Sequence, residues 1–319
     1  MKKFKTKQNY GFGRSLKYAA KNALRNHYGD GRYSSRATVL SKCAGFFEFL
    51  KARQIYDFRK VNRTIVQQYA EVVQQEVDLR LGSATGQGKL SAVNQLMLAL
   101  SGHRENWVSP VAYAGRRTQV RSEVPLGLDA EKIEKVLSES DLAMEIKVVL
   151  KLCRQFGLRV REATLLELPH AARQARRHGS FLLSRGCKGG RVRDVPVDAE
   201  GLKVLEEVHS VLGRVCVIPE GWNYVKFSRF AYRSWGPVAK KWGLATGFHD
   251  LRAAFGCAAY TDVAGFDAPV VSGGVQSPKD LEARQHVAEL LGHGRTQIAA
   301  AYVGTRRPLK LEHDERREQ

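Results

Sequence analysis

Four separated segments of the sequence carry side chains that could bind an oxyanion, attack it and move protons. A guanidinium group stays charged at any working pH and binds such oxygens through paired donors, whereas tyrosine can act as a nucleophile and histidine or lysine can transfer protons. The segments hold Arg159 and Glu162 in "GLRVREATLLEL", Lys188 in "CKGGR", His249 and Arg252 in "HDLR", and His293 and Tyr302 in "LGHGRTQIAAAY". Taken singly each segment is weak evidence, because an Arg-rich chain with nine histidines matches His-x-x-Arg by chance.

The spacing within each segment predicts how its side chains are placed. Arg159 and Glu162 lie three residues apart, as do His249 and Arg252, so each pair is expected on one helix face. In a continuous helix His293 and Tyr302 would point in opposite directions, because they lie two and a half turns apart. They converge only if the helix breaks, so we expect Gly294 to end one helix and Thr296 to begin another. The alternative is an ordinary helix corner with Tyr302 completing the core.

The charge of the chain indicates a polyanionic partner. It has 52 Lys and Arg residues against 32 Asp and Glu residues, a net charge of +20 at pH 7. Nucleic acid is favoured over an anionic membrane, because each neutralised phosphate releases counterions and no apolar run reaches membrane-spanning length. The basic start "MKKFKTKQNYGF" is not followed by an apolar core, so no signal peptide is expected there. The five cysteines are scattered without a CxxC pair, which predicts a reduced cytoplasmic protein with no zinc site or disulfide framework.

The elements that must position these segments fall into two predicted domains. Residues 1–110 read as an all-helical, strongly basic DNA-binding domain, and residues 111–126 read as an extended, basic linker in which Gly115, Pro125 and three arginines break the helical periodicity. Residues 127–319 form the second domain, with a helix beginning near Asp129 and a long apolar helix in "LAMEIKVVLKLCRQFGL". The clearest β signal is a hairpin in "SFLLSRGCKGGRVRDVPV", and the region around 262–283 reads as a loop.

Basic residues of the first domain and the linker are the candidate DNA contacts. Basic stripes on helices are also what a solvated face looks like, and both interpretations can hold at once. The candidates are Lys17, Lys21, Arg25, Arg36, Arg116, Arg117 and Arg121.

Taken in order, the four segments resemble the tyrosine recombinase (phage integrase) superfamily. "GLRVREATLLEL" is similar to the first arginine box of that family, and "CKGGRVRDVPV" to its lysine hairpin. "HDLR" and "ELLGHGRTQIAAAY" match the later boxes and the nucleophile. The resemblance covers about residues 127–305 by motif. The residues before 127 are similar to the family's core-binding domain only in being helical and basic. It implies a mainly helical fold with a small β-sheet: an all-helical core-binding domain and a mixed α+β catalytic domain.

The resemblance also implies a role for each side chain. Arg159, Arg252 and His293 would stabilise the charge on the phosphate oxygens, and Tyr302 would attack to give a 3′-phosphotyrosine. His249 would accept the phenol proton, Lys188 would protonate the departing 5′ oxygen, and Glu162 would orient Arg159. Because the phosphotyrosine keeps the bond energy, no metal, ATP or other cofactor is expected.

The function implied is a site-specific DNA recombinase or integrase of a prophage or other mobile element. Its partners would be double-stranded recombination sites, bound as a homotetramer on synapsed DNA. The expectation further includes a monomer when free of DNA, an accessory DNA-bending or directionality factor, and no membrane. The expected location is the bacterial cytoplasm, associated with the nucleoid. The alternatives are a chromosome-dimer resolvase, a type IB topoisomerase-like enzyme, or a catalytically dead DNA-binding protein on the same fold.

Two stretches depart from the family pattern. After "LLEL" relatives continue into a strand, whereas this chain has "PHAARQARRHGS", so the first strand is uncertain. The interval from His249 to His293 is longer than usual, and the surplus lies around 262–283. That segment is either a surface insertion or an added contact to DNA or to a neighbouring protomer.

Overall fold

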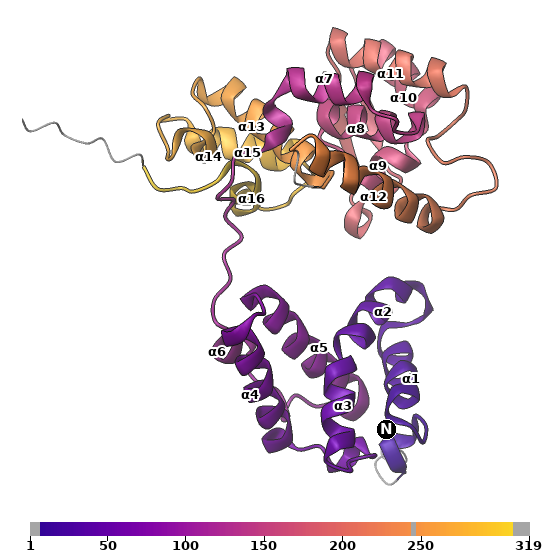
Figure 1. Cartoon of the computed structure of the whole chain (residues 1–319), viewed down its shortest axis with the longest axis vertical. Coiled ribbons are helices and arrows are strands. Elements are labelled where there is room, and N and C mark those ends of the chain that lie inside the picture. The colour runs from indigo at the N-terminus through magenta and orange to yellow at the C-terminus, as the bar shows by residue number, and fades with distance from the viewer. Residues whose placement is uncertain (1–6, 244–246, 309–319) are drawn as a thin grey trace, which may run out of the picture. The chain divides into compact units, whose positions relative to one another are not determined.

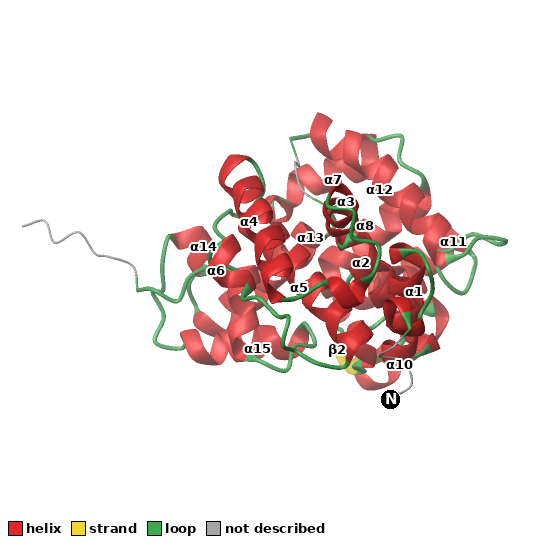
Figure 2. Ribbon diagram, turned by 90° about the horizontal axis from the view of Figure 1, so that it is seen from below, coloured by secondary structure: helices red, strands yellow, loops and turns green. Residues whose placement is uncertain are grey.

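The computed structural model describes residues 7–243 and 247–308, which fall into two compact units, Met1–Thr118 and Gln119–Gln319. Both are built mainly from helices, and the described part of the chain has one antiparallel pair of short strands (Figures 1 and 2). The predicted fold class is therefore confirmed. Among the described residues no helix is both long and apolar enough to cross a membrane.

The first unit is all helical, as predicted. Ser15 and Asn62 cap α1 and α4, their side-chain oxygens accepting hydrogen bonds from the backbone N–H groups of Tyr18 and Ile65. Its core is apolar and aromatic, with Phe46 lying 5.0 Å from the ring of Tyr69. The helices are α1 (Leu16–Tyr28), α2 (Tyr33–Lys42), α3 (Ala44–Ala52), α4 (Arg63–Leu79), α5 (Ser83–Ser101) and α6 (Pro110–Ala114), with 3₁₀ turns at Gln8–Gly11, Asp30–Arg32 and Phe58–Lys60.

The segment that we predicted to be an extended linker is only partly extended. It begins inside α6, because Ser109 accepts a hydrogen bond from the N–H of Ala112 and Pro110 occupies the first helical position, where no N–H is needed. At its other end the backbone N–H of Arg121 donates to the carbonyl of Ala300 at 2.9 Å. Residues from Gln119 onward therefore belong structurally to the second unit.

The second unit has two apolar cores. One surrounds α8, where Phe156 packs edge-on against Phe181, and the other lies between α13, α15 and α16. Its elements are α7 (Ala130–Glu139), α8 (Met144–Phe156), α9 (Val160–Leu165), α10 (Leu168–His178), β1 (Ser180–Leu183), β2 (Arg193–Pro196), α11 (Ala199–Leu212), α12 (Tyr224–Lys241), α13 (His249–Ala264), α14 (Pro269–Ser272), α15 (Asp280–Leu290) and α16 (Ala300–Val303), with 3₁₀ turns at Leu126–Leu128, Lys188–Gly190 and Thr296–Ala299.

The predicted hairpin is present, and the residues before it, where the sequence left a strand uncertain, form a helix. β1 pairs with β2 from Ser180↔Pro196 to Leu183↔Arg193. "PHAARQARRHGS" forms most of α10, because its alanines lie on one buried face and Gly179 ends the helix in the left-handed region at φ +67°.

The 262–283 segment packs against its own chain just after Tyr302. The N–H of Val275 donates to the carbonyl of Arg307 at 2.9 Å. A side chain at Gly304 would come within 2.8 Å of Val270, so the two backbones lie in close contact there. Directly after the segment, Arg284, at 0% exposure, binds Asp280 at 2.7 Å and donates to the carbonyl groups of Gly304 and Thr305. The segment thus holds the chain that follows α16.

Candidate active site

Tyr302 lies at the centre of the candidate site with its hydroxyl surrounded by nitrogen donors and acceptors. The side chain is buried on α16, at 3% exposure. Its hydroxyl oxygen lies 2.9 Å from Nε2 of His293, and Nε of Arg252 donates to it at 3.4 Å. The ring of His249 lies 5.4 Å from the Tyr302 ring, centroid to centroid. The structure therefore brings these four side chains together from two of the four segments.

The helix breaks between His293 and Tyr302, but at a different glycine from the one predicted. Gly292, with φ +65°, follows α15, and its N–H donates to the carbonyl of Glu289 at 2.8 Å. The N–H of His293 donates to the carbonyl of Ala288 at 2.7 Å, which completes a Schellman motif. The expectation for Gly294 was wrong, because the left-handed residue directly follows the helix C-cap.

The new helical turn also starts without the predicted cap. It begins at Thr296, but no side-chain hydrogen bond caps it, and Arg295 precedes it in an extended conformation. Thr296 therefore does not act as the cap. The chain is redirected by the Schellman motif at Gly292, and this motif fixes the backbone of His293.

Arg159 and Glu162 interact at the start of α9. Arg159 is the N-cap residue, and Nη1 donates to the Glu162 carboxylate at 2.6 Å while the backbone N–H of Arg159 donates to it at 2.9 Å. The side chain of Arg159 is 21% exposed, and its Nη2 lies 3.5 Å from Nε2 of His293. Glu162, at 0% exposure, thus orients a guanidinium group that is still accessible from outside.

Arg252 is held differently, because it is fully buried. Its two terminal nitrogens donate to the carbonyl groups of Gly157 and Leu291, which leaves Nε directed at Tyr302. Gly157 has φ +58°, and a side chain there would come within 2.4 Å of Phe255, so no larger residue fits. His249 and Arg252 share a face of α13, as their spacing predicts.

Burial and the cations of the site lower the pKa values of both histidines, and the cations lower the pKa of Glu162. Burial is the main cause for His293, followed by the charges of Arg252, Arg159, Arg193 and Lys188, and together they lower its pKa to about 4. Burial and nearby arginines also lower the pKa of His249. Burial would raise the pKa of Glu162, but hydrogen bonds and charges from Arg193 and Arg159 outweigh it and bring the pKa to about 2. At neutral pH both imidazoles are therefore neutral and Glu162 is charged.

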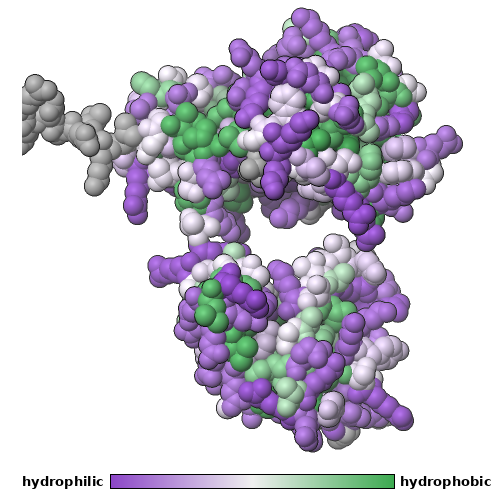
Figure 3. All heavy atoms as spheres, in the orientation of Figure 1, coloured by the Kyte–Doolittle hydropathy of each residue, from purple (hydrophilic) through white to green (hydrophobic). Residues whose placement is uncertain are grey.

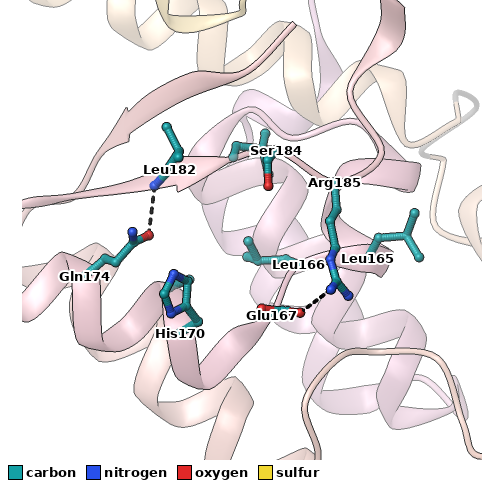
Figure 4. A pocket seen from close by; sticks show the side chains of 10 residues that line it. Leu165, Leu166, Glu167, His170, Gln174, Leu182, Ser184 and Arg185 are labelled. Atoms are coloured by element: carbon teal, nitrogen blue, oxygen red, sulfur yellow. Dashed lines mark hydrogen bonds and ion pairs between the residues drawn. The ribbon is translucent and has the colours of Figure 1, made fainter. Parts of the chain in front are cut away.

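Lys188 lies exposed in the turn between β1 and β2. Among the described residues its amino group has no hydrogen bond or ion pair, although its charge acts on His293. The hairpin itself is anchored on α10, where the side-chain oxygen of Gln174 accepts from the N–H of Leu182 at 3.0 Å. Arg185 binds Glu167 at 2.7 Å beside a small cavity of about 40 Å³ (Figure 4).

Sequence reasoning missed Arg193, which binds Glu162 from β2. Nη2 and Nη1 of Arg193 donate to the two carboxylate oxygens at 2.9 and 3.2 Å, and the side chain is only 8% exposed. The available signal was the pattern "RVRDVP", in which alternation along a strand directs Arg193 and Val195 to the same, inner face.

The candidate DNA contacts differ in how accessible they are, and Arg121 has to be withdrawn. Its side chain is 15% exposed and forms an ion pair with Asp250, which is itself 5% exposed, so it is not free to bind a phosphate. Arg36 is also 15% exposed and lies near Asp30, at 3.7 Å. Lys17, Lys21, Arg25, Arg116 and Arg117 are exposed.

Hydrophilic side chains cover much of the visible surface of each unit (Figure 3). In the first unit, Lys21, Arg25 and Arg36 line a hollow of about 250 Å³ between α1 and α2. No group of three or more His, Cys, Asp or Glu side chains that could hold a metal ion occurs in the parts of the chain that the structure describes.

Comparisons with known proteins give matches in structure alone. No protein-family model matches the sequence, and no curated protein matches it either. The fold is similar to lambda integrase (residues 75–356) in a dimer bound to a COC′ core site, with a TM-score of 0.60 at 15% identity over 93% of this chain and 94% of that one.

Two other solved structures are similar over comparable lengths. XerH site-specific recombinase bound to a palindromic difH substrate matches with a TM-score of 0.60 at 17% identity, over 91% of this chain and 80% of that one. The Tn1549 transposon integrase in complex with transposon right end DNA matches with a TM-score of 0.56 at 10% identity, over 90% and 95% of the two chains. The chain described here has the fold of the tyrosine recombinases.

Proposed function

We propose that this protein is a site-specific DNA recombinase that cuts and rejoins DNA through a 3′-phosphotyrosine intermediate. The observation that carries the proposal is the setting of the Tyr302 hydroxyl, 2.9 Å from Nε2 of His293 and 3.4 Å from Nε of Arg252. A buried tyrosine in a structural role needs one hydrogen-bond partner. Here the hydroxyl is placed among cations, next to the accessible guanidinium of Arg159, which suits attack on a phosphate.

In the proposed reaction the Tyr302 oxygen attacks the scissile phosphorus. The bond from phosphorus to the 5′ oxygen breaks, Lys188 gives its proton to that oxygen, and the 3′ end stays on the tyrosine. Arg159 would bind the non-bridging oxygens, whereas Arg252, with both terminal nitrogens bound to backbone carbonyls, would act through Nε. Attack by a free 5′ hydroxyl reverses the step and rejoins the strand.

The phenol proton is proposed to pass to His293 rather than to His249. A neutral imidazole accepts a proton only within hydrogen-bond reach, and Nε2 of His293 satisfies this condition at 2.9 Å. His249 lies against the ring, at 5.4 Å between centroids, and no hydrogen bond joins it to the hydroxyl in the described structure. This changes the role that the resemblance implied for each histidine.

Double-stranded DNA is the proposed partner, and the net charge of +20 supports it. The structures with a similar fold are DNA complexes, including a lambda integrase tetramer bound to a Holliday junction, and we propose an equivalent tetramer here. We also propose that the protein belongs to a prophage or other mobile element and acts in the cytoplasm. A chromosome-dimer resolvase is the second candidate, because it would use the same residues, and the XerH site-specific recombinase is as similar in fold as lambda integrase is.

The test is covalent capture on a nicked suicide substrate. Junctions formed in cells between the DNA flanking the gene and a target library are sequenced first, and the recovered site is then synthesised with a nick. The unaltered protein should form a protease-sensitive adduct, and Tyr302→Phe should form none while binding the duplex with unchanged affinity. Tyr232→Phe, which removes an exposed hydroxyl in the same unit, is the matched control. An adduct formed by Tyr302→Phe would overturn the assignment.

A further inference from the structure

The loop that carries Lys188 is fastened to α9 at both of its ends. It leaves β1 after Leu183 and returns at Arg193, the last pair of the strand ladder. On the outgoing side, a side chain at Gly186 would lie 2.6 Å from the carbonyl oxygen of Arg161, so the loop backbone contacts the backbone of α9 directly. Gly186 also has φ +77°, which only glycine adopts without strain.

On the returning side the fastening is the buried ion pair between Arg193 and Glu162. Both carboxylate oxygens are engaged, and the two side chains are 8% and 0% exposed. Such bidentate pairs fix orientation as well as distance. The same side chain borders Gly292, where an added Cβ would come within 2.9 Å of its Cδ, so Arg193 also packs against the turn that holds His293.

The hydrogen-bonding groups of Arg193 are not all paired, although full pairing would be expected of a purely structural residue. Its Nε is buried and has no hydrogen-bond partner among the described residues. A donor left in that state is costly, and a buried ion pair is weak evidence for stability, because replacing both of its partners by apolar residues is often neutral. The arrangement is therefore explained better by what the guanidinium group holds in place than by stability.

We propose that Arg193 is a positioning residue that sets Lys188 against the departing 5′ oxygen by fastening its loop to Glu162. The proposal rests on the proposed function and adds a residue to it. It separates Arg193 from Arg159, which shares the same carboxylate but reaches the site with its own guanidinium group. Loss of Arg193 should therefore resemble loss of Lys188 rather than loss of Arg159.

The leaving group provides a selective test, because a 5′ sulfur departs without a proton. Single-turnover cleavage is measured at saturating DNA on matched suicide substrates with a bridging 5′ oxygen or 5′ sulfur. On oxygen, Arg193→Met should be slower by about 10- to 100-fold, the usual effect of losing an orienting partner. On sulfur it should return to within a few-fold of the unaltered protein, as Lys188→Ala should. Arg193→Lys should recover part of the oxygen rate.

The control is Arg185→Met, the same change in the same loop. Its ion pair with Glu167 is exposed, with side chains at 64% and 35%, and pairs of that kind contribute little (Figure 4). It should cleave both substrates normally. If Arg193→Met fails to fold, Gly186→Ala loosens the other end of the loop and should show the same rescue by sulfur.

The outcomes separate the two proposals. An Arg193→Met defect of equal size on oxygen and sulfur, or no defect on either, overturns the positioning role while leaving Tyr302 as the nucleophile. If the unaltered protein forms no adduct on either substrate, the proposed function fails and this inference fails with it.

Discussion

Nε2 of His293 lies 2.9 Å from the hydroxyl oxygen of Tyr302, although nine residues and the end of a helix separate them. The contact exists because the Schellman motif at Gly292 turns the chain, and the short helix that follows then brings Tyr302 back toward the histidine. Burial and nearby cations lower the pKa of His293, so the imidazole is neutral at pH 7 and Nε2 can accept a hydrogen bond from the phenol.

The first prediction concerns the titration of His293. Burial and the charges of Arg252, Arg159, Arg193 and Lys188 place its pKa at about 4, below the ordinary 6.5. Because the folded pKa is lowered, the neutral form should persist as pH falls through 6.5 and be lost only near 4. NMR titration of the ring protons in the DNA-free protein measures this, and a midpoint near 6.5 would contradict the geometry described here.

The second prediction compares the two histidines as proton acceptors. His293→Gln should slow covalent capture by about 100- to 10,000-fold, the range for losing a general base. His249→Gln should have a smaller effect, because its imidazole is not hydrogen-bonded to the hydroxyl. Both variants are compared at saturating DNA, so that weaker binding does not enter the rate. A larger defect in His249→Gln would return the role of base to that residue.

The third prediction distinguishes the two arginines. Arg159→Ala should lower cleavage by about 100-fold or more, as expected for a lost transition-state donor, with a small change in the free energy of unfolding. Arg252→Ala should lower both quantities, because it leaves two buried carbonyl groups unpaired at about 1–3 kcal/mol each. Urea unfolding and suicide-substrate cleavage, measured on the same preparations, test this difference. Equal losses of stability would show that the burial of Arg252 has no energetic consequence.

The fourth prediction is that strand cleavage and rejoining proceed in EDTA without any nucleotide. The phosphotyrosine conserves the bond energy, and the groups proposed to stabilise the phosphate are arginines. The assay compares recombination of the recovered site with and without the chelator. A strict requirement for magnesium would favour a two-metal mechanism instead.

The fifth prediction concerns the boundary between the two units. A fragment beginning at Gln119 keeps the ion pair of Arg121 with Asp250 and its backbone bond to Ala300, whereas one beginning at Ser122 loses both. The longer fragment should therefore cleave faster. Both should bind DNA more weakly than the full chain, and with a shallower dependence on salt, because fewer phosphates are neutralised. Equal salt slopes would mean that the basic faces of the first unit are only solvated.

The sequence by itself determined most of the helices, the hairpin and the chemical groups, but not α6 or α14, which lie in stretches predicted to be a linker and a loop. Local patterns are enough for this, because apolar spacing sets α8, glycines set the Lys188 turn, and residues three apart on a helix share a face. The small β-sheet was likewise predicted from two short runs around a Gly-rich turn. These features depend on neighbours in the chain, so one sequence is enough to read them.

Only the tertiary structure decided how those groups are partnered. "RVRDVP" is a plausible strand sequence, but nothing in it shows that Arg193 meets Glu162, because the two residues are brought together by the packing of β2 near α9. Arg121 lies among arginines that suit DNA, yet Asp250 binds it at the start of α13. The glycine that turns the chain before Tyr302 was also misassigned, because Gly292 and Gly294 are equivalent in sequence. Which of the two glycines turns the chain depends on the residue at which α15 ends, because the carbonyl groups of its last turn accept the hydrogen bonds of the Schellman motif. The tertiary packing of the helix sets that residue.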